Sequence, residues 1–209
     1  EDLSTFMKRR ISLSETIWGL YTTKISSYLY DVQLLFNKMS LPVVWRDIYK
    51  TVEENEDNYD KRYHAWFITK EYNGKSKDIL SKIMDESNDA SEYTGGAYFG
   101  FSMIRIPEMY YIMAEALLEE GDRERARDYL DIVVSARGMV KFADRDTGKD
   151  ITLEDIMNER RKELFGEGQW WFCLKRLNRD IYVHALDATL KGGDKIYTLP
   201  LPTEELDPR

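Results

Sequence analysis

The chain has 209 residues, which is long enough to bury a substantial core without disulfide or metal staples. Its 30 Lys and Arg residues against 38 Asp and Glu residues give a net charge of -8. This is the wrong sign for a protein held mainly by the phosphates of nucleic acids or anionic lipids. The single cysteine excludes an internal disulfide and every CxxC-type zinc or redox site. The composition therefore indicates an acidic, aromatic-rich globular chain, with no apolar run approaching the ~20 residues that span a bilayer.

The first hundred residues show little sustained periodicity. Residues 24–39 have apolar side chains at helical spacing, whereas residues 40–102 combine scattered glycines with many aromatic residues. Short strands are predicted at 66–68 and, near the other end of the chain, at 196–199. Loops as long as those predicted between residues 40 and 102 are usually functional or disordered, and their aromatic content favours function.

The second half of the chain is predicted to be helical. Pro107 suits the first turn of a helix, because its missing N–H would have no partner there. Gly121 interrupts the helical spacing, and Gly138 is a candidate C-terminal cap for the helix that follows. The sequence therefore predicts an αα-hairpin with helices at 107–119 and 123–136.

The spacing of apolar residues predicts which sides of these two helices face inward. On the first helix, the residues predicted to face the core are Ile106, Met109, Tyr110, Met113, Ala116 and Leu117. On the second helix, they are Ala126, Tyr129, Leu130, Val133 and Val134. Ala116 and Ala126 are expected at the closest approach, because small side chains allow tight helix packing.

A second helical pair is predicted over residues 152–178. Thr152 and Asp155 resemble a capping box with Asp in place of the usual Glu, and they open the first helix of this pair. In the second helix, Cys173 is expected to be a small buried apolar residue rather than a nucleophile. Two such hairpins are fewer than the three repeats that a stable solenoid needs, so further repeats are expected elsewhere.

Motifs for metal, phosphate or nucleophilic chemistry are missing from the sequence. His64 and His184 are far apart and lack ligand spacing. The segment 144–150 begins like a calcium loop but has Lys149 at the position that requires glycine. The glycine-rich segment 95–100 matches no phosphate-binding motif. No metal and no cofactor are therefore predicted.

One pair of carboxylates has a spacing compatible with general acid–base chemistry. Glu159 and Glu163 are separated by one helical turn. Three basic residues lie between them, at 160–162, which is the ordinary composition of a solvated or ion-paired helix face. We therefore expect a structural role for both carboxylates.

The loop-rich region offers aromatic rings as candidate ligand contacts. Rings on loops can stack against flat partners, and sugars present such faces through their C–H groups. The candidate ligand-binding residues are Trp45, Tyr49, Trp66, Tyr72 and Tyr98. The alternative for each ring is that it anchors a loop in the core.

Residues 105–116, RIPEMYYIMAEA, resemble the SusD/RagB family of surface lipoproteins, which bind nutrients, mostly glycans, for uptake across the outer membrane of Bacteroidetes. The resemblance continues in order along the chain. The further matching segments are 14–18, 59–62, 126–138, 156–168 and 199–205.

This resemblance implies a mainly α fold of tetratricopeptide-like helical hairpins, an α-α superhelix with a long loop-rich region and minor β structure. It implies a loop-rich, ligand-facing part over 1–104, and helical hairpins with a closing segment over 105–209. Family members are normally about twice as long, so the chain is expected to be the C-terminal part of one.

The function that the resemblance implies is binding of an oligosaccharide or polysaccharide at the cell surface, without catalysis. The expected partner is a TonB-dependent, SusC-like outer-membrane transporter, and the expected attachment is a lipid anchor outside this sequence. Two alternatives stay open: a helical-repeat module that binds a protein and no sugar, and a glycoside hydrolase with a carboxylate pair.

Overall fold

The computed structural model describes residues 14–21, 48–49, 60–72, 74–80, 100–145, 149–183 and 186–198. The chain divides into two compact units, residues 1–166 and residues 167–209. The predicted division into a loop-rich region, 1–104, and helical hairpins with a closing segment, 105–209, stays a prediction. Each unit is described by itself below.

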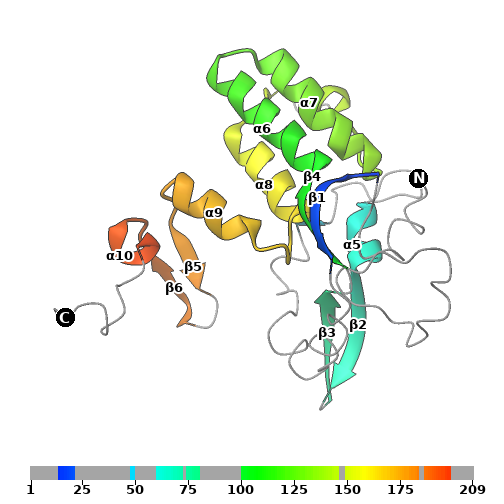
Figure 1. The fold of residues 1–209 in the computed structure, drawn as a ribbon, viewed down its shortest axis with the longest axis vertical. Coiled ribbons are helices and arrows are strands. Elements are labelled where there is room, and N and C mark those ends of the chain that lie inside the picture. Colours follow the sequence, from blue (N-terminus) through cyan, green and yellow to red (C-terminus); the bar gives the residue numbers. More distant parts are fainter. Residues whose placement is uncertain are drawn as a thin grey trace. The chain divides into compact units, whose positions relative to one another are not determined.

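Three longer helices pack together in the described part of the first unit (Figure 1). They are α6 (Ile106–Glu119), α7 (Arg123–Ala136) and α8 (Leu153–Glu163). Helix α6 packs against both α7 and α8, and a short 3₁₀ helix, η1 (Phe142–Asp144), follows α7. The predicted hairpin of helices at 107–119 and 123–136 is confirmed, with one more residue at the start of α6.

Both ends of the α6–α7 turn have caps that the sequence encodes locally. Gly121 has a φ of +87°, and the N–H of Asp122 donates to the carbonyl of Leu117 at 2.9 Å, which closes α6 with a Schellman motif. The side chain of Asp122 then accepts a hydrogen bond from the N–H of Arg125 and starts α7. Gly138, with a φ of +83°, ends α7 in the predicted way.

The apolar core of the first unit lies between α6, α7 and α8. Its fully buried side chains include Tyr111 and Ala114 from α6, Leu130 and Val134 from α7, and Ile156 from α8. The buried residues predicted on α7 are confirmed at Ala126, Leu130, Val133 and Val134. The capping box of Thr152 and Asp155 is present at the start of α8.

The inward face predicted for α6 is largely wrong. Leu117 is buried, but Ile106, Met109, Met113 and Ala116 are exposed. The buried stripe instead runs along the opposite side of the helix. The physical reason is that α6 has apolar residues on both sides, and its buried side also carries Glu108 and Glu115, which pair with Arg160 of α8. Periodicity alone therefore does not identify the side that α7 and α8 cover. The predicted contact between Ala116 and Ala126 is therefore also wrong at Ala116.

Two antiparallel strand pairs complete the described part of the first unit. Strand β1 (Thr16–Tyr21) pairs with β4 (Gly100–Arg105), which leads directly into α6. Helix α5 (Lys61–Trp66) leads into the hairpin of β2 (Phe67–Tyr72) and β3 (Lys75–Leu80).

The region predicted as long loops is thus more regular than expected. A strand was predicted at 66–68, and it is present from Phe67 onward, whereas Trp66 is the last residue of α5. The helical spacing over residues 24–39 lies outside the described residues.

The second unit contains α9 (Gln169–Arg176), the hairpin of β5 (Ile181–Val183) and β6 (Ala188–Leu190), and α10 (Asp194–Tyr197). Cys173 is buried, as predicted. The helices predicted over 152–178 both form, but α8 and α9 fall in different units. Their packing as a second hairpin stays a prediction.

The strand predicted at 196–199 is wrong at its first two residues. The N–H groups of Ile196 and Tyr197 both donate to the carbonyl of Gly193 at 3.0 Å. These bonds form one helical turn in place of a strand. Within the described ranges, no helix has the length and apolar character needed to cross a membrane.

Candidate functional site

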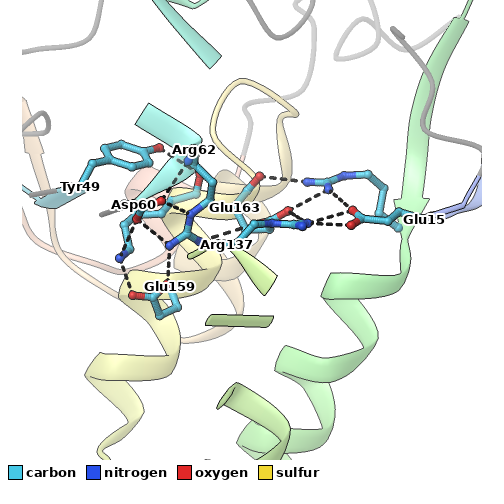
Figure 2. Close-up of polar contacts among 9 residues, drawn as sticks. Glu15, Tyr49, Asp60, Arg62, Arg137, Glu159 and Glu163 are labelled. Atoms are coloured by element: carbon cyan, nitrogen blue, oxygen red, sulfur yellow. Dashed lines mark hydrogen bonds and ion pairs between the residues drawn. The ribbon is translucent and has the colours of Figure 1, made fainter. Parts of the chain in front are cut away.

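A buried cluster of charged side chains lies in the first unit, where segments distant in sequence meet (Figure 2). Four carboxylates and four cations make contacts shorter than 3.5 Å, so their formal charges balance. The carboxylates are Glu15, Asp60, Glu159 and Glu163, and the cations are Arg62, Arg105, Arg137 and Lys162. We call these eight residues the charge cluster.

Glu163, the last residue of α8, is the centre of the charge cluster. Its carboxylate accepts two hydrogen bonds from Arg137, at 3.0 and 2.8 Å, and one from Arg105 at 2.9 Å. Arg62 approaches the same carboxylate at 3.4 Å, and Arg105 also donates to the backbone carbonyl of Glu163. The side chain of Glu163 has no exposed surface, so these three guanidinium groups replace water around its charge.

Arg62 connects the start of α5 to α8. Its guanidinium binds Asp60 through two nitrogens, at 2.8 and 2.7 Å, and Glu159 at 2.7 Å. Asp60 is also the N-cap of α5, because its carboxylate accepts the N–H of Arg62. Lys162 pairs with both Asp60 and Glu159. The local cap and the long-range ion pairs therefore depend on the same aspartate.

Glu15 brings the segment before β1 into the charge cluster. Both of its carboxylate oxygens accept hydrogen bonds from Arg137, at 3.0 and 2.9 Å, and Arg105 lies 3.3 Å away. The backbone carbonyl of Glu15 also accepts the N–H of Ile106 at 2.8 Å. These contacts tie the β1–β4 pair to the ends of α7 and α8.

The electrostatics of the charge cluster keep its α8 carboxylates ionised. Burial alone would raise the pKa of Glu159, but Lys162 and Arg62 overcome it and lower that pKa to about 2. Burial opposes ionisation of Glu163 as well, yet Arg137, Arg105 and Arg62 hold its pKa well below the usual range. A carboxyl group that stays ionised at neutral pH and is sealed from solvent is unsuited to general acid catalysis. These contacts support the predicted structural role of Glu159 and Glu163, which is ion pairing. The side of α8 that carries them is buried rather than solvated.

Two of the rings predicted to stack on a sugar lie instead in a core. Tyr49 and Trp66 are each 1% exposed, and they pack with Ala65, Phe67 and Leu80. The hydroxyl of Tyr49 donates to the backbone carbonyl of Lys162 at 2.9 Å. A ring enclosed in this way has no free face for a sugar. The alternative prediction, that each ring anchors a loop in the core, therefore fits Tyr49 and Trp66.

The structure does not test the other three candidate rings. Trp45 and Tyr98 lie outside the described residues. Tyr72 ends strand β2, and only its backbone is described.

Exposed rings that sequence reasoning did not select lie on described elements in both units. Trp18 on β1 is 53% exposed. In the second unit, Trp171 and Phe172 on α9 and Tyr182 on β5 are also exposed. The run of β-branched and aromatic residues at 16–21 could have identified the strand that carries Trp18.

Sequence reasoning also missed the charge cluster, although its members stand inside the motifs that carry the family resemblance. Glu15 lies in segment 14–18, Asp60 and Arg62 in 59–62, and Arg105 starts 105–116. Arg137, Glu159, Lys162 and Glu163 belong to the remaining helical motifs. Each motif contains at least one acidic or basic residue, and this recurrence could have indicated the charge cluster.

Comparisons with known proteins identify the family of the chain. The model of the SusD family matches residues 79–198, which is more than half of the chain. The chain belongs to the SusD family. No protein with a curated description matches it.

Several solved structures from Bacteroides vulgatus resemble the chain. A SusD superfamily protein is 27% identical with a TM-score of 0.53, and the match covers 70% of this chain and 33% of that one. A SusD-like carbohydrate binding protein is 21% identical with a TM-score of 0.59, over 90% of this chain and 43% of that one. A putative sugar binding protein, also 21% identical, has a TM-score of 0.56 over 85% and 38%.

These likenesses confirm a mainly α, SusD-like fold. The chain spans between 33% and 43% of the length of these solved relatives. Within the described residues, no group of His, Cys, Asp and Glu has the arrangement of a metal site.

Proposed function

We propose that this chain is part of a cell-surface protein that binds a glycan and does not transform it. The observation that carries this proposal is the match of the SusD family model to residues 79–198. The likeness of the fold to a SusD-like carbohydrate binding protein supports it. The charge cluster supplies no catalytic carboxylate from α8, because Glu159 and Glu163 are buried and paired with cations.

We further propose that the glycan is passed to a TonB-dependent, SusC-like transporter in the outer membrane. Family membership supports this partner and this location, together with attachment through a lipid anchor outside the sequence. The net charge of -8 argues against nucleic acid or a directly bound anionic membrane as the main partner.

Stacking is the proposed mode of glycan recognition, with Trp45, Tyr72 and Tyr98 as the residues that contact the sugar. Indole and phenol rings offer flat faces, and carbohydrate C–H groups supply the complementary surface. Trp45 is the first choice because indole has the largest face.

A glycan array probed with the purified chain, followed by calorimetry on each hit, tests the proposal. Trp45→Ala is expected to lower affinity at least tenfold with little change in melting temperature. Trp66→Ala is the matched control, because removal of a buried indole destabilises by about 3–5 kcal/mol without touching the sugar.

Two outcomes would oppose this assignment. If both variants lower the melting temperature and spare affinity, the glycan site lies elsewhere. If no glycan binds the chain or the longer protein, or if a bound glycan is hydrolysed, the proposal of a binding protein fails. If the longer protein does not co-purify with a SusC-like transporter from native membranes, the transporter proposal is left without support.

A further inference from the structure

The hairpin of β2 and β3 carries its basic and acidic residues on separate faces. Side chains alternate between the two faces along a strand, and residues directly opposite each other in a pair of strands share a face. The register pairs Lys70 with Lys77 and Tyr72 with Lys75. Since these positions are two residues apart along each strand, all four belong to one face. We call Lys70, Tyr72, Lys75 and Lys77 the basic face.

The acidic residues of the hairpin belong to the other face. Glu71 pairs with Ser76 across the strands, and Asp78 pairs with Thr69. The carboxylate of Asp78 accepts hydrogen bonds from the hydroxyls of Thr69 at 2.8 Å and Tyr63 at 3.0 Å. Among the residues of β2 and β3, the basic face therefore contains three lysines and no carboxylate.

This distribution of charge is not the one that best stabilises a hairpin. Opposite charges directly across from each other stabilise a pair of strands, and like charges in the same position destabilise it. Lys70 and Lys77 are such a like-charged pair, whereas Glu71 is placed opposite a serine. Lysines on exposed strands can also prevent aggregation, but that role does not require two of them to be directly opposite. An anion bound between the lysines would remove the repulsion.

The basic face lies toward the end of the hairpin that leaves the core. Along β3, Lys75 and Ser76 are exposed, Lys77 is half-buried, and the last three residues are buried. Both strands extend away from α5 (Figure 1). The two lysines of β3 are about 7 Å apart along the strand, and Lys70 is directly across from one of them. The charges are thus repeated along an accessible strip.

We infer that the basic face binds an acidic glycan, whose carboxylate or sulfate groups pair with the lysines while a sugar ring stacks on Tyr72. The inference rests on the proposed function and names the class of glycan. Charge complementarity supports it, because an acidic polysaccharide carries its negative groups at regular intervals. An ammonium group is a compact point charge with rotatable donors, so it accepts either carboxylate or sulfate. Tyr72, already proposed as a sugar contact, shares the face with the lysines.

A single glycan chain fits the basic face better than an anionic membrane does. A membrane presents an extended charged surface, which the net charge of -8 of this chain opposes. A glycan chain can contact the hairpin alone. At physiological ionic strength, charges are screened over about 8 Å, so the lysines attract the bound strip of glycan while distant carboxylates contribute little.

Calorimetry on the 209-residue chain tests the inference with two acidic ligands and their neutral counterparts. The acidic ligands are an oligogalacturonate and a dextran sulfate oligosaccharide, and the neutral ones are the methyl ester of the first and the unsulfated form of the second. At least one acidic ligand should bind about tenfold more tightly than its neutral counterpart, with an affinity that falls as salt is added. The two acidic ligands distinguish carboxylate from sulfate.

Variants of the lysines assign the effect to the basic face. Lys75→Gln with Lys77→Gln should lower affinity for the acidic ligand about tenfold. Lys141→Gln with Lys175→Gln is the matched control, because both residues are exposed and the net charge changes equally. Lys75→Arg with Lys77→Arg keeps the charges and should keep the affinity. Since Lys77 is half-buried, Lys75→Gln is also measured alone and should lower affinity about threefold.

Four results would overturn the inference. The first is equal affinity for the acidic and neutral ligands, and the second is an equal loss in the control variant. The third is unchanged affinity in the variant of Lys75 and Lys77, which would leave these lysines the role of preventing aggregation. The fourth is loss of binding to phosphatidylglycerol vesicles in that variant without loss of binding to either acidic ligand, which would make a membrane the occupant.

These results are distinguishable from failure of the proposed function. A neutral glycan that binds the chain with the same affinity in every lysine variant would leave the proposed function intact and overturn only the inference. If the chain and the longer protein bind no glycan of either kind, the proposed function itself fails.

Discussion

Two of the interiors that the structure describes in the unit of residues 1–166 are built on opposite principles. Between α6, α7 and α8 the interior is apolar, and its members come from residues 111–156. At the other end of α8 the interior is charged, and its members come from residues 15–163. The apolar interior is assembled by neighbouring helices, whereas the charge cluster joins a strand, two loops and the ends of three helices.

The difference shows what each interior contributes. Apolar burial is non-directional and tolerates changes of partner, so it stabilises the helical stack without defining how distant segments meet. Buried ion pairs cost desolvation energy and are favourable only with near-complete pairing. We therefore interpret the charge cluster as the set of interactions that selects one arrangement of β1, α5, α7 and α8.

The largest expected difference between the two interiors is their response to low pH, which should destabilise the charge cluster much more than the apolar interior. The pKa of Glu159 is lowered to about 2 from an ordinary value of 4.5, and that of Glu163 is lowered in the same direction. A lowered pKa contributes stability that is complete above the ordinary pKa and is lost as the pH falls through the folded value. The urea midpoint should therefore fall steeply from about pH 5 toward pH 2. Glu159→Gln should lower the midpoint at pH 7 and flatten this slope, and equal stability at pH 3 and pH 7 would contradict the interpretation.

Removal of the central charge is the next largest expected effect. Glu163→Gln leaves Arg105 and Arg137 buried without their main counter-ion, which should destabilise by about 3–5 kcal/mol. Glu119→Gln, on the exposed end of α6, is the control and should change stability little. Glycan affinity of the folded fraction should be unchanged in both. A loss of affinity in Glu163→Gln at full folding would instead assign this carboxylate to the ligand site.

Overpacking the apolar interior should have a smaller effect. Ala126 has no exposed surface in α7, so Ala126→Phe should cost about 1–3 kcal/mol in thermal unfolding. Ala116→Phe, on the exposed side of α6, is the matched control and should be tolerated in the 209-residue chain. Equal melting temperatures for wild type and Ala126→Phe would count against the α6–α7 packing.

The smallest effect is expected at the turn between α6 and α7. Asp122→Ala removes the hydrogen bond that caps α7 and should cost about 1 kcal/mol. Asp128→Ala, in the exposed middle of the same helix, removes a charge but no cap. If the two variants are equally stable in urea titrations, the cap makes no measurable contribution to the free energy of unfolding.

Much of the helical part could be predicted from the sequence. The ends of α6 and α7 were correct to within a residue, because Pro107, Gly121, Asp122 and Gly138 act locally through caps and turn geometry. The helical turn at Ile196 was not predictable in the same way. Its two large β-forming residues favour a strand by propensity, and the preceding glycine turn decided the outcome.

The amino-acid sequence by itself determined that α6, α7, α8 and α9 become helices and which family the chain resembles, since both depend on local spacing and on motifs read in order. Only the tertiary structure decided which side of α6 is buried, because that helix has apolar residues on both sides and the packing of its neighbours determines which side is covered. The same holds for the aromatic residues: Trp66 and Tyr49 have the composition of a ligand contact, but packing encloses them. The charge cluster depends most on the tertiary structure. Its residues are up to 148 positions apart, from Glu15 to Glu163. They are also of the same amino-acid types as ordinary ion-paired surface residues. What distinguishes the residues of the charge cluster is their burial away from water, which occurs only when the chain folds.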